Sequence, residues 1–148
     1  MIHIGNSEHG RRIAHAAGVG YDPEMDQVLS RVTPEGNLRG GVIFTNYSKV
    51  SIQMHMAGFE KNWATPEFLV ANFNYPFNQL EVRQVLAAVP STNVLAMEID
   101  IKLGFELLTL IPGAVPDGDM VILSMSREQC KWLKLVPRYP RVRQEQAA

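Results

Sequence analysis

The chain has a single cysteine, Cys130, among its 148 residues. One thiol excludes an intrachain disulfide framework and any zinc site built on several thiolates, and it suits a reducing compartment, so we expect a cytoplasmic protein. An excess of one charge is also missing, since 14 Lys and Arg residues balance 15 Asp and Glu residues for a formal net charge of -1. This balance disfavours nucleic acid as a partner, because holding a phosphate backbone needs clustered excess cations.

Long apolar runs are absent as well. No stretch of the sequence approaches the roughly 20 apolar residues of a membrane span, and the first ten residues lack the apolar segment of a signal peptide. We therefore expect no membrane partner and no export signal. No metal site is predicted, because the N-terminal histidines show no spacing that places two ligands on one face: His3, His9 and His15.

What remains is the composition of one ordinary globular domain, 46% hydrophobic and 20% charged. A length of 148 residues is enough to bury one core and too short for two independent ones. We expect a single domain over residues 1–136. The remaining residues, 137–148, combine three arginines with prolines and a polar end, and are expected to form a mobile tail.

Turn residues and hydrophobic periodicity predict a mixed order of helices and strands. Strands are expected over 27–32, 38–47, 50–56, 82–89, 105–111 and 120–125. Helices are expected over 8–17, from a cap at Thr65 towards Pro76, over 91–102 with an apolar stripe of Val94, Met97 and Ile101, and over 126–135. The last two strands are expected to join through a long connection at 112–118. Hairpins at both ends exclude a doubly wound sheet and favour a mixed α/β (α+β) fold.

One segment carries a more specific pattern. Asn93 opens a predicted helix that closes with a Lys-Leu-Gly-Phe sequence at 102–105, and two predicted strands follow. This run resembles the GNAT family of N-acetyltransferases, and segment 125–132 is similar to the closing segment of GNAT-like proteins from phages and bacteria. The resemblance covers residues 38–133. It implies a mostly antiparallel central sheet, flanked by helices, whose fourth and fifth strands splay apart.

The resemblance implies an acetyl-CoA-dependent N-acyltransferase that acts on an amine the sequence does not identify. In the family the pantetheine arm lies between the splayed strands, here 53–58 and 85–89. The cofactor contacts carried over from the family lie at the strand end, in the turn that follows and at the helix-opening Asn: Met56, Ala57, Gly58, Asn62, Trp63, Ala64, Thr65 and Asn93. The helix after this turn suits a diphosphate, because free amides and the helix dipole favour anions.

Two departures from the family's pattern bear on activity. A glycine-free turn at 62–67 replaces the glycine-rich diphosphate loop, and Asp100 stands where many members carry the Tyr that protonates the departing thiolate. An Asp can donate that proton near neutral pH only where burial raises its pKa. His55 and Glu60 are the candidate general bases, His55 for the ordinary range of an imidazole pKa and Glu60 for its expected place at the cleft mouth.

These departures support an alternative, a GNAT-shaped binding or scaffold protein without turnover. In either case loops 18–26 and 112–119 are expected to select the acceptor. A homodimer through the last strands is compatible with the sequence.

Overall fold

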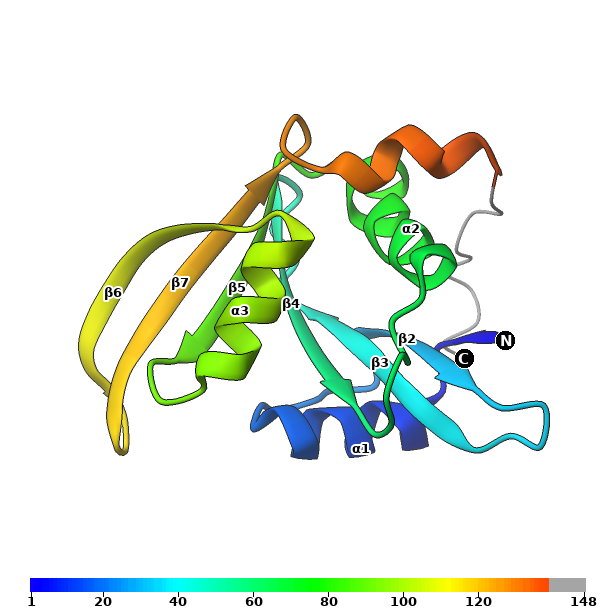
Figure 1. Cartoon of the computed structure of the whole chain (residues 1–148), viewed down its shortest axis with the longest axis horizontal. Helices are drawn as coiled ribbons and strands as arrows, with labels where there is room; N and C mark the ends of the chain where they lie inside the picture. Colours follow the sequence, from blue (N-terminus) through cyan, green and yellow to red (C-terminus); the bar gives the residue numbers. More distant parts are fainter. Residues whose placement is uncertain (139–148) are drawn as a thin grey trace.

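The structure, a computed structural model, describes residues 1–138 of the chain and contains one seven-stranded sheet in the order β1-β2-β3-β4-β5-β7-β6 (Figure 1). The strands are β1 (Ile2–Ile4), β2 (Gln27–Val32), β3 (Leu38–Thr45), β4 (Ser51–Gly58), β5 (Gln84–Pro90), β6 (Glu106–Val115) and β7 (Gly118–Ser126). The helices are α1 (Ser7–Ala17), α2 (Pro66–Asn74) with a π-helical extension η1 (Tyr75–Gln79), α3 (Val94–Leu103) and the 3-10 helix η2 (Lys131–Arg138). The expected tail lies almost wholly outside the described residues.

Every neighbouring pair in the sheet is antiparallel except β4 and β5. The expectation of a mixed fold with a mostly antiparallel sheet is therefore confirmed. None of the helices in residues 1–138 has the length and apolar character that a membrane span needs.

Capping residues begin the three α-helices, at Thr65 and Asn93 as the sequence predicts and at Asn6, which was not predicted. The side-chain oxygens of Asn6, Thr65 and Asn93 each accept a hydrogen bond from the amide three residues later, at 3.0, 3.3 and 3.2 Å. Gly18 and Gly104 follow α1 and α3 with φ of 73° and 118°, a left-handed conformation that glycine adopts without steric strain.

Alternation along the central strands distributes side chains to two cores. On β4, Ile52 and Met54 are buried in the larger core, which packs against α2 and η1. Gln53 and His55 therefore point to the other face of the sheet, which α1 covers. The smaller core lies on that face and consists of Ile13, Ala14, Val28, Leu38 and Ile43.

Four expectations are corrected. The closing helix expected over 126–135 is wrong at its start, since residues 127–129 form a turn and η2 begins only at Lys131. Strand β1 was not predicted, because its three residues are too short for a periodic signal, yet it pairs with β2. The long connection expected at 112–118 between the last two strands is wrong. Strand β6 continues through Pro112 and Gly113, and the turn is confined to 116–117. The apolar stripe on α3 is also wrong: Val94 and Ile101 are more than half exposed, because this helix packs instead through the side that carries Asp100 and Leu103.

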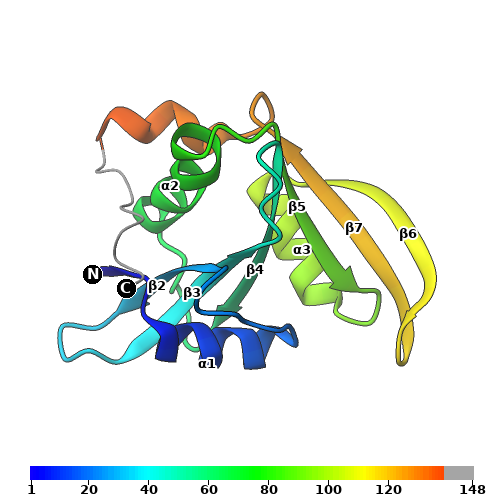
Figure 2. The ribbon, with the colours of Figure 1, turned by 180° about the vertical axis from the view of Figure 1, so that it is seen from behind.

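Strands β4 and β5 pair only at one end. Their register runs over 51–53 and 84–86, after which β4 stays on β3 and β5 stays on β7. Figures 1 and 2 show the two strands side by side at this end and diverging towards α1 and the tip of the β6–β7 hairpin. The predicted splay of the middle strands is thus confirmed, and it leaves the remaining edge of β4 without a strand partner.

Candidate functional site

The opening between the two strands forms a cavity of about 580 Å³, which we call the inter-strand cleft. Its walls are the end of β4, the loop 59–65, the end of β5 and one side of α3. Most residues that were predicted to bind the cofactor line it: Met56, Ala57, Gly58, Asn62, Trp63, Ala64 and Asn93. Thr65 is not among the lining residues, and its hydroxyl is occupied in capping α2.

One side of α3 forms a wall of the cleft because residues three and four apart share a helix face. Leu95, Ile99 and Leu103 recur with this spacing, and Asp100 lies among them. Asp100 is 7% exposed, and within residues 1–134, whose side chains the structure describes, no donor makes a hydrogen bond to its carboxylate. Burial without a partner disfavours the charged form and raises the pKa of Asp100 to about 6. A protonated carboxyl is therefore accessible near neutral pH.

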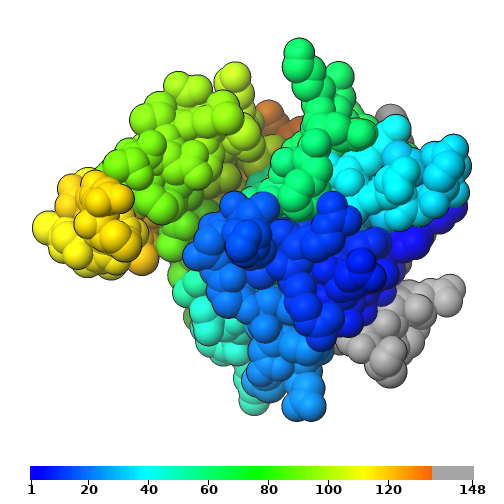
Figure 3. All heavy atoms as spheres, turned by 90° about the horizontal axis from the view of Figure 1, so that it is seen from below, coloured from blue at the N-terminus to red at the C-terminus, as the bar shows by residue number. Residues whose placement is uncertain are grey.

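A second cavity of about 1130 Å³, the loop cavity, lies on the α1 side of the sheet. It is bounded by loop 18–26, the ends of β3 and β5, and β7. Figure 3 shows α1 and the loop after it between the β2–β3 turn and α3. Asp22 and Asp26 are the charged carboxylates that line this cavity, and no Lys or Arg of the described chain does so. The loop cavity therefore favours a cationic ligand.

The two cavities meet at the splay. His55 and residues 88–90 line both of them. Ligands held in the two cavities would therefore contact the same residues at the splay.

His55 is positioned at this junction as a neutral imidazole. Its Nε2 lies 3.1 Å from the Thr45 hydroxyl oxygen, across the β3–β4 ladder. Burial lowers the pKa of His55, and the carboxylate of Asp26 raises it by a smaller amount. An imidazole with a lowered pKa is uncharged at pH 7 and can accept a proton.

Glu60, the other predicted base, lines neither cavity. Its Oε1 lies 2.8 Å from Arg39 Nε, in an ion pair whose N–H is not aligned for a hydrogen bond. The structure therefore brings His55 and Asp100 to the cleft and leaves Glu60 on the outside of the loop.

Sequence reasoning missed the support beneath Trp63. The indole covers Gly40 and Gly58 so closely that a Cβ on either glycine would lie 2.5 or 2.0 Å from a ring atom. Glycine inside a strand marks the close approach of another group, so the Gly40-Gly41 pair in β3 was a usable signal. Arg31, which contacts the same loop, carries no local signal.

Known proteins resemble this chain in structure and not in sequence. No protein-family model matches the sequence, and no curated protein matches it. A variant of the spermidine N-acetyltransferase SpeG from Vibrio cholerae is similar in structure, with a TM-score of 0.71, 14% identity, and coverage of 90% of this chain and 97% of that one. A GNAT-family acetyltransferase from Bacillus anthracis has a TM-score of 0.62 at 14% identity, covering 86% and 94%. The chain has the fold of GNAT acetyltransferases.

Proposed function

We propose that this chain is an acetyl-CoA-dependent N-acyltransferase. The observation that carries the proposal is the splay between β4 and β5, which joins the inter-strand cleft to the loop cavity at His55. Acyl transfer between two substrates needs such a passage, because the donor and the acceptor must meet while both are held in place.

The residues of the cleft fit acetyl-CoA. The free edge of β4 offers the backbone groups of Met56 to the pantetheine amides. The Phe59 amide bonds to Arg39 of β3, so the alternate residue Ala57 faces β3 as well, and its predicted backbone contact with the cofactor is not available. The loop before α2 offers unpaired amides to the diphosphate. Asn93 lies at the β5 end of the cleft, where its side chain caps α3. When bound, acetyl-CoA supplies an acetyl group activated as a thioester.

The acceptor would occupy the loop cavity, where Asp22 and Asp26 favour a molecule that carries positive charge, while the nitrogen that attacks the thioester must itself be neutral. The structural similarity to spermidine N-acetyltransferase SpeG accords with such an acceptor. His55 would take the proton that the acceptor nitrogen loses on attack, and Asp100 would give a proton to the departing sulfur. The products are then an N-acetylated amine and a free thiol.

Acetyl-CoA should stabilise the folded chain. A ligand that binds only the native state, present at 100 times its Kd, adds about 2.7 kcal/mol to the free energy of unfolding and raises Tm by several degrees. Thermal unfolding with and without acetyl-CoA measures this effect. No shift at millimolar acetyl-CoA would contradict the proposal, whereas a shift without thiol release over a panel of amines would support the alternative of a binding protein without turnover.

His55→Gln should lower kcat/KM by about a hundredfold, the usual scale for loss of a general base. In the wild-type protein, kcat/KM should fall as the pH drops through the lowered pKa of His55, because protonation removes the acceptor lone pair. That acidic limb should be missing in the variant. His15→Gln, at an exposed position of α1, is the matched control and should leave the profile unchanged. An acidic limb retained in His55→Gln would assign the base elsewhere.

A further inference from the structure

The loop before α2 has to present amides to an anion without the help of glycine. Residues 59–65 contain no glycine, and Asn62 has a φ of 58°, in the left-handed region that an L-residue rarely adopts. Such a conformation persists only where neighbouring residues stabilise it.

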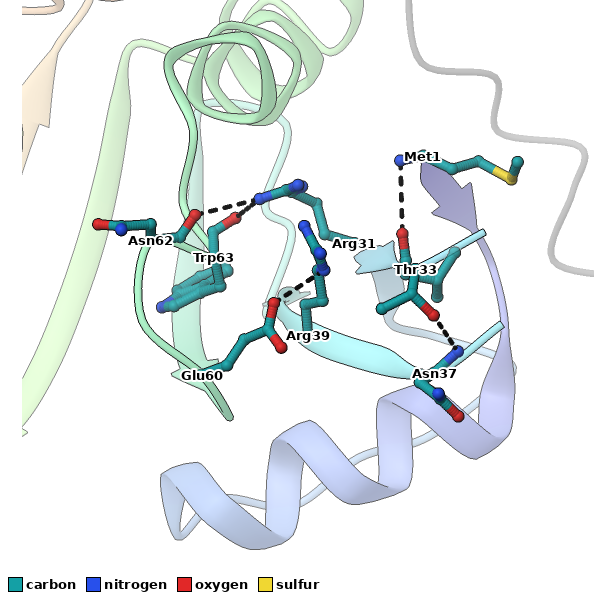
Figure 4. A network of polar contacts seen from close by, with 9 residues as sticks. Met1, Arg31, Thr33, Asn37, Arg39, Glu60, Asn62 and Trp63 are labelled. Carbon is teal, nitrogen blue, oxygen red and sulfur yellow. Dashed lines mark hydrogen bonds and ion pairs between the residues drawn. The ribbon is translucent and has the colours of Figure 1, made fainter. Parts of the chain in front are cut away.

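Arg31, on β2, contacts this loop from outside the cleft. Its Nη1 donates to the carbonyl oxygen of Asn62 at 3.2 Å and also to the carbonyl oxygen of Trp63. Figure 4 shows both bonds reaching from Arg31 to the loop. Two successive carbonyls are thereby turned towards one cation, 31 and 32 residues distant in sequence.

The orientation of these carbonyls determines the orientation of the next two amides. The described chain has no cis peptide bond, and in a trans peptide the N–H points opposite to the C=O of the same peptide unit. The N–H groups of Trp63 and Ala64 therefore point away from Arg31. Neither makes a hydrogen bond within residues 1–138, and both residues line the inter-strand cleft.

These amides matter because the cleft has no cationic side chain in the described part of the chain. No Lys or Arg of the described chain lines it, so an anion bound there depends on backbone N–H groups. We infer that Arg31 is a positioning residue that orients the Trp63 and Ala64 amides towards the diphosphate of CoA, in place of the conformational freedom that glycine would provide. This inference rests on the proposed function.

Arg39 provides a matched control. It lies on the neighbouring strand β3, is also an arginine, and forms an ion pair with Glu60 of the same loop. It donates to neither the Asn62 nor the Trp63 carbonyl. Its removal should therefore loosen the loop without turning the two amides.

The test measures CoA binding by titration calorimetry in the full chain and in the Arg31→Ala, Arg31→Lys and Arg39→Ala variants, each checked for folding by circular dichroism. Arg31→Ala should weaken CoA binding by about tenfold or more, the scale of one lost charge-assisted hydrogen bond. Arg31→Lys, which keeps a cationic donor, should bind more tightly than Arg31→Ala, and Arg39→Ala should remain near wild type. The kcat/KM with S-acetylpantetheine, a donor without the diphosphate, should be unchanged in Arg31→Ala.

Equal CoA affinity in the wild-type and Arg31→Ala proteins would overturn the role of Arg31 and leave the proposed function standing. An equal loss with S-acetylpantetheine would also overturn it, because the defect would then lie outside the diphosphate contact. A wild-type chain that does not bind CoA would overturn the proposed function together with this inference.

Discussion

Asp100→Asn should make the protein more stable above pH 7 and should lower kcat by about a hundredfold, the scale expected for loss of a general acid. Both effects have one cause. The Asp100 carboxyl is buried without a hydrogen-bond partner, so folding disfavours its charged form. Asn has nearly the same shape and no charge, and it cannot supply the proton.

The sign of the pH dependence follows from the direction of the pKa shift. The pKa of Asp100 is raised from 3.8 in the unfolded chain to about 6 in the folded one. The contribution of the protonated carboxyl to stability is therefore fully present well below the unfolded pKa, and it is lost as the pH rises from 3.8 through about 6. A shift of this size corresponds to about 3 kcal/mol above pH 7.

Urea unfolding of both proteins at about pH 3 and pH 8 measures the difference. The gap in free energy of unfolding should be small at the lower pH, which lies below the unfolded pKa, and should reach its full size at pH 8. Glu98→Gln is the matched control, because Glu98 is an exposed carboxylate on the same helix. A variant that is less stable than wild type at pH 8 would show that the fold favours the carboxylate, and full turnover would exclude Asp100 as the general acid.

Gly58→Ala should destabilise the protein by about 1–3 kcal/mol, the usual range for overpacking, and should weaken CoA binding. A Cβ at this position would lie 2.0 Å from Trp63 Nε1 and 2.2 Å from Cδ1. The indole has little room to turn away, because its other side contacts Phe68 at a ring-centroid distance of 5.5 Å. Displacing Trp63 would shift the loop that carries the unpaired amides.

Urea unfolding and CoA titration measure the two losses, with Gly20→Ala as the control. Gly20 lies in an open loop where an added Cβ meets no atom within 4 Å, and its φ is not in the left-handed region. A double-mutant cycle with Trp63→Ala isolates the contact, since removal of the indole should abolish most of the cost of the Cβ. Additive losses in the cycle would mean that the two residues do not interact as described.

Site residues could be predicted where their position follows from the local sequence, and could not where it depends on a partner from another strand. Residues 56–58, predicted to contact the cofactor, line the inter-strand cleft, and this position follows from a strand with clear alternation and from the GNAT resemblance. Glu60 was placed at the cleft mouth because it follows that strand directly. The structure turns it outwards to Arg39, a partner on another strand that no local pattern announces.

The sequence by itself determined where α1 and α3 end, where α2 begins, and which side chains alternate across the central strands. Those features depend on capping atoms and on neighbours within about four residues along the chain. Only the tertiary structure decided that Asp100 is buried without a partner, that Trp63 lies on Gly58, and that Arg31 turns the loop carbonyls. Burial, steric contact and long-range hydrogen bonds depend on what packs against a residue from elsewhere in the chain, and no local pattern encodes that partner.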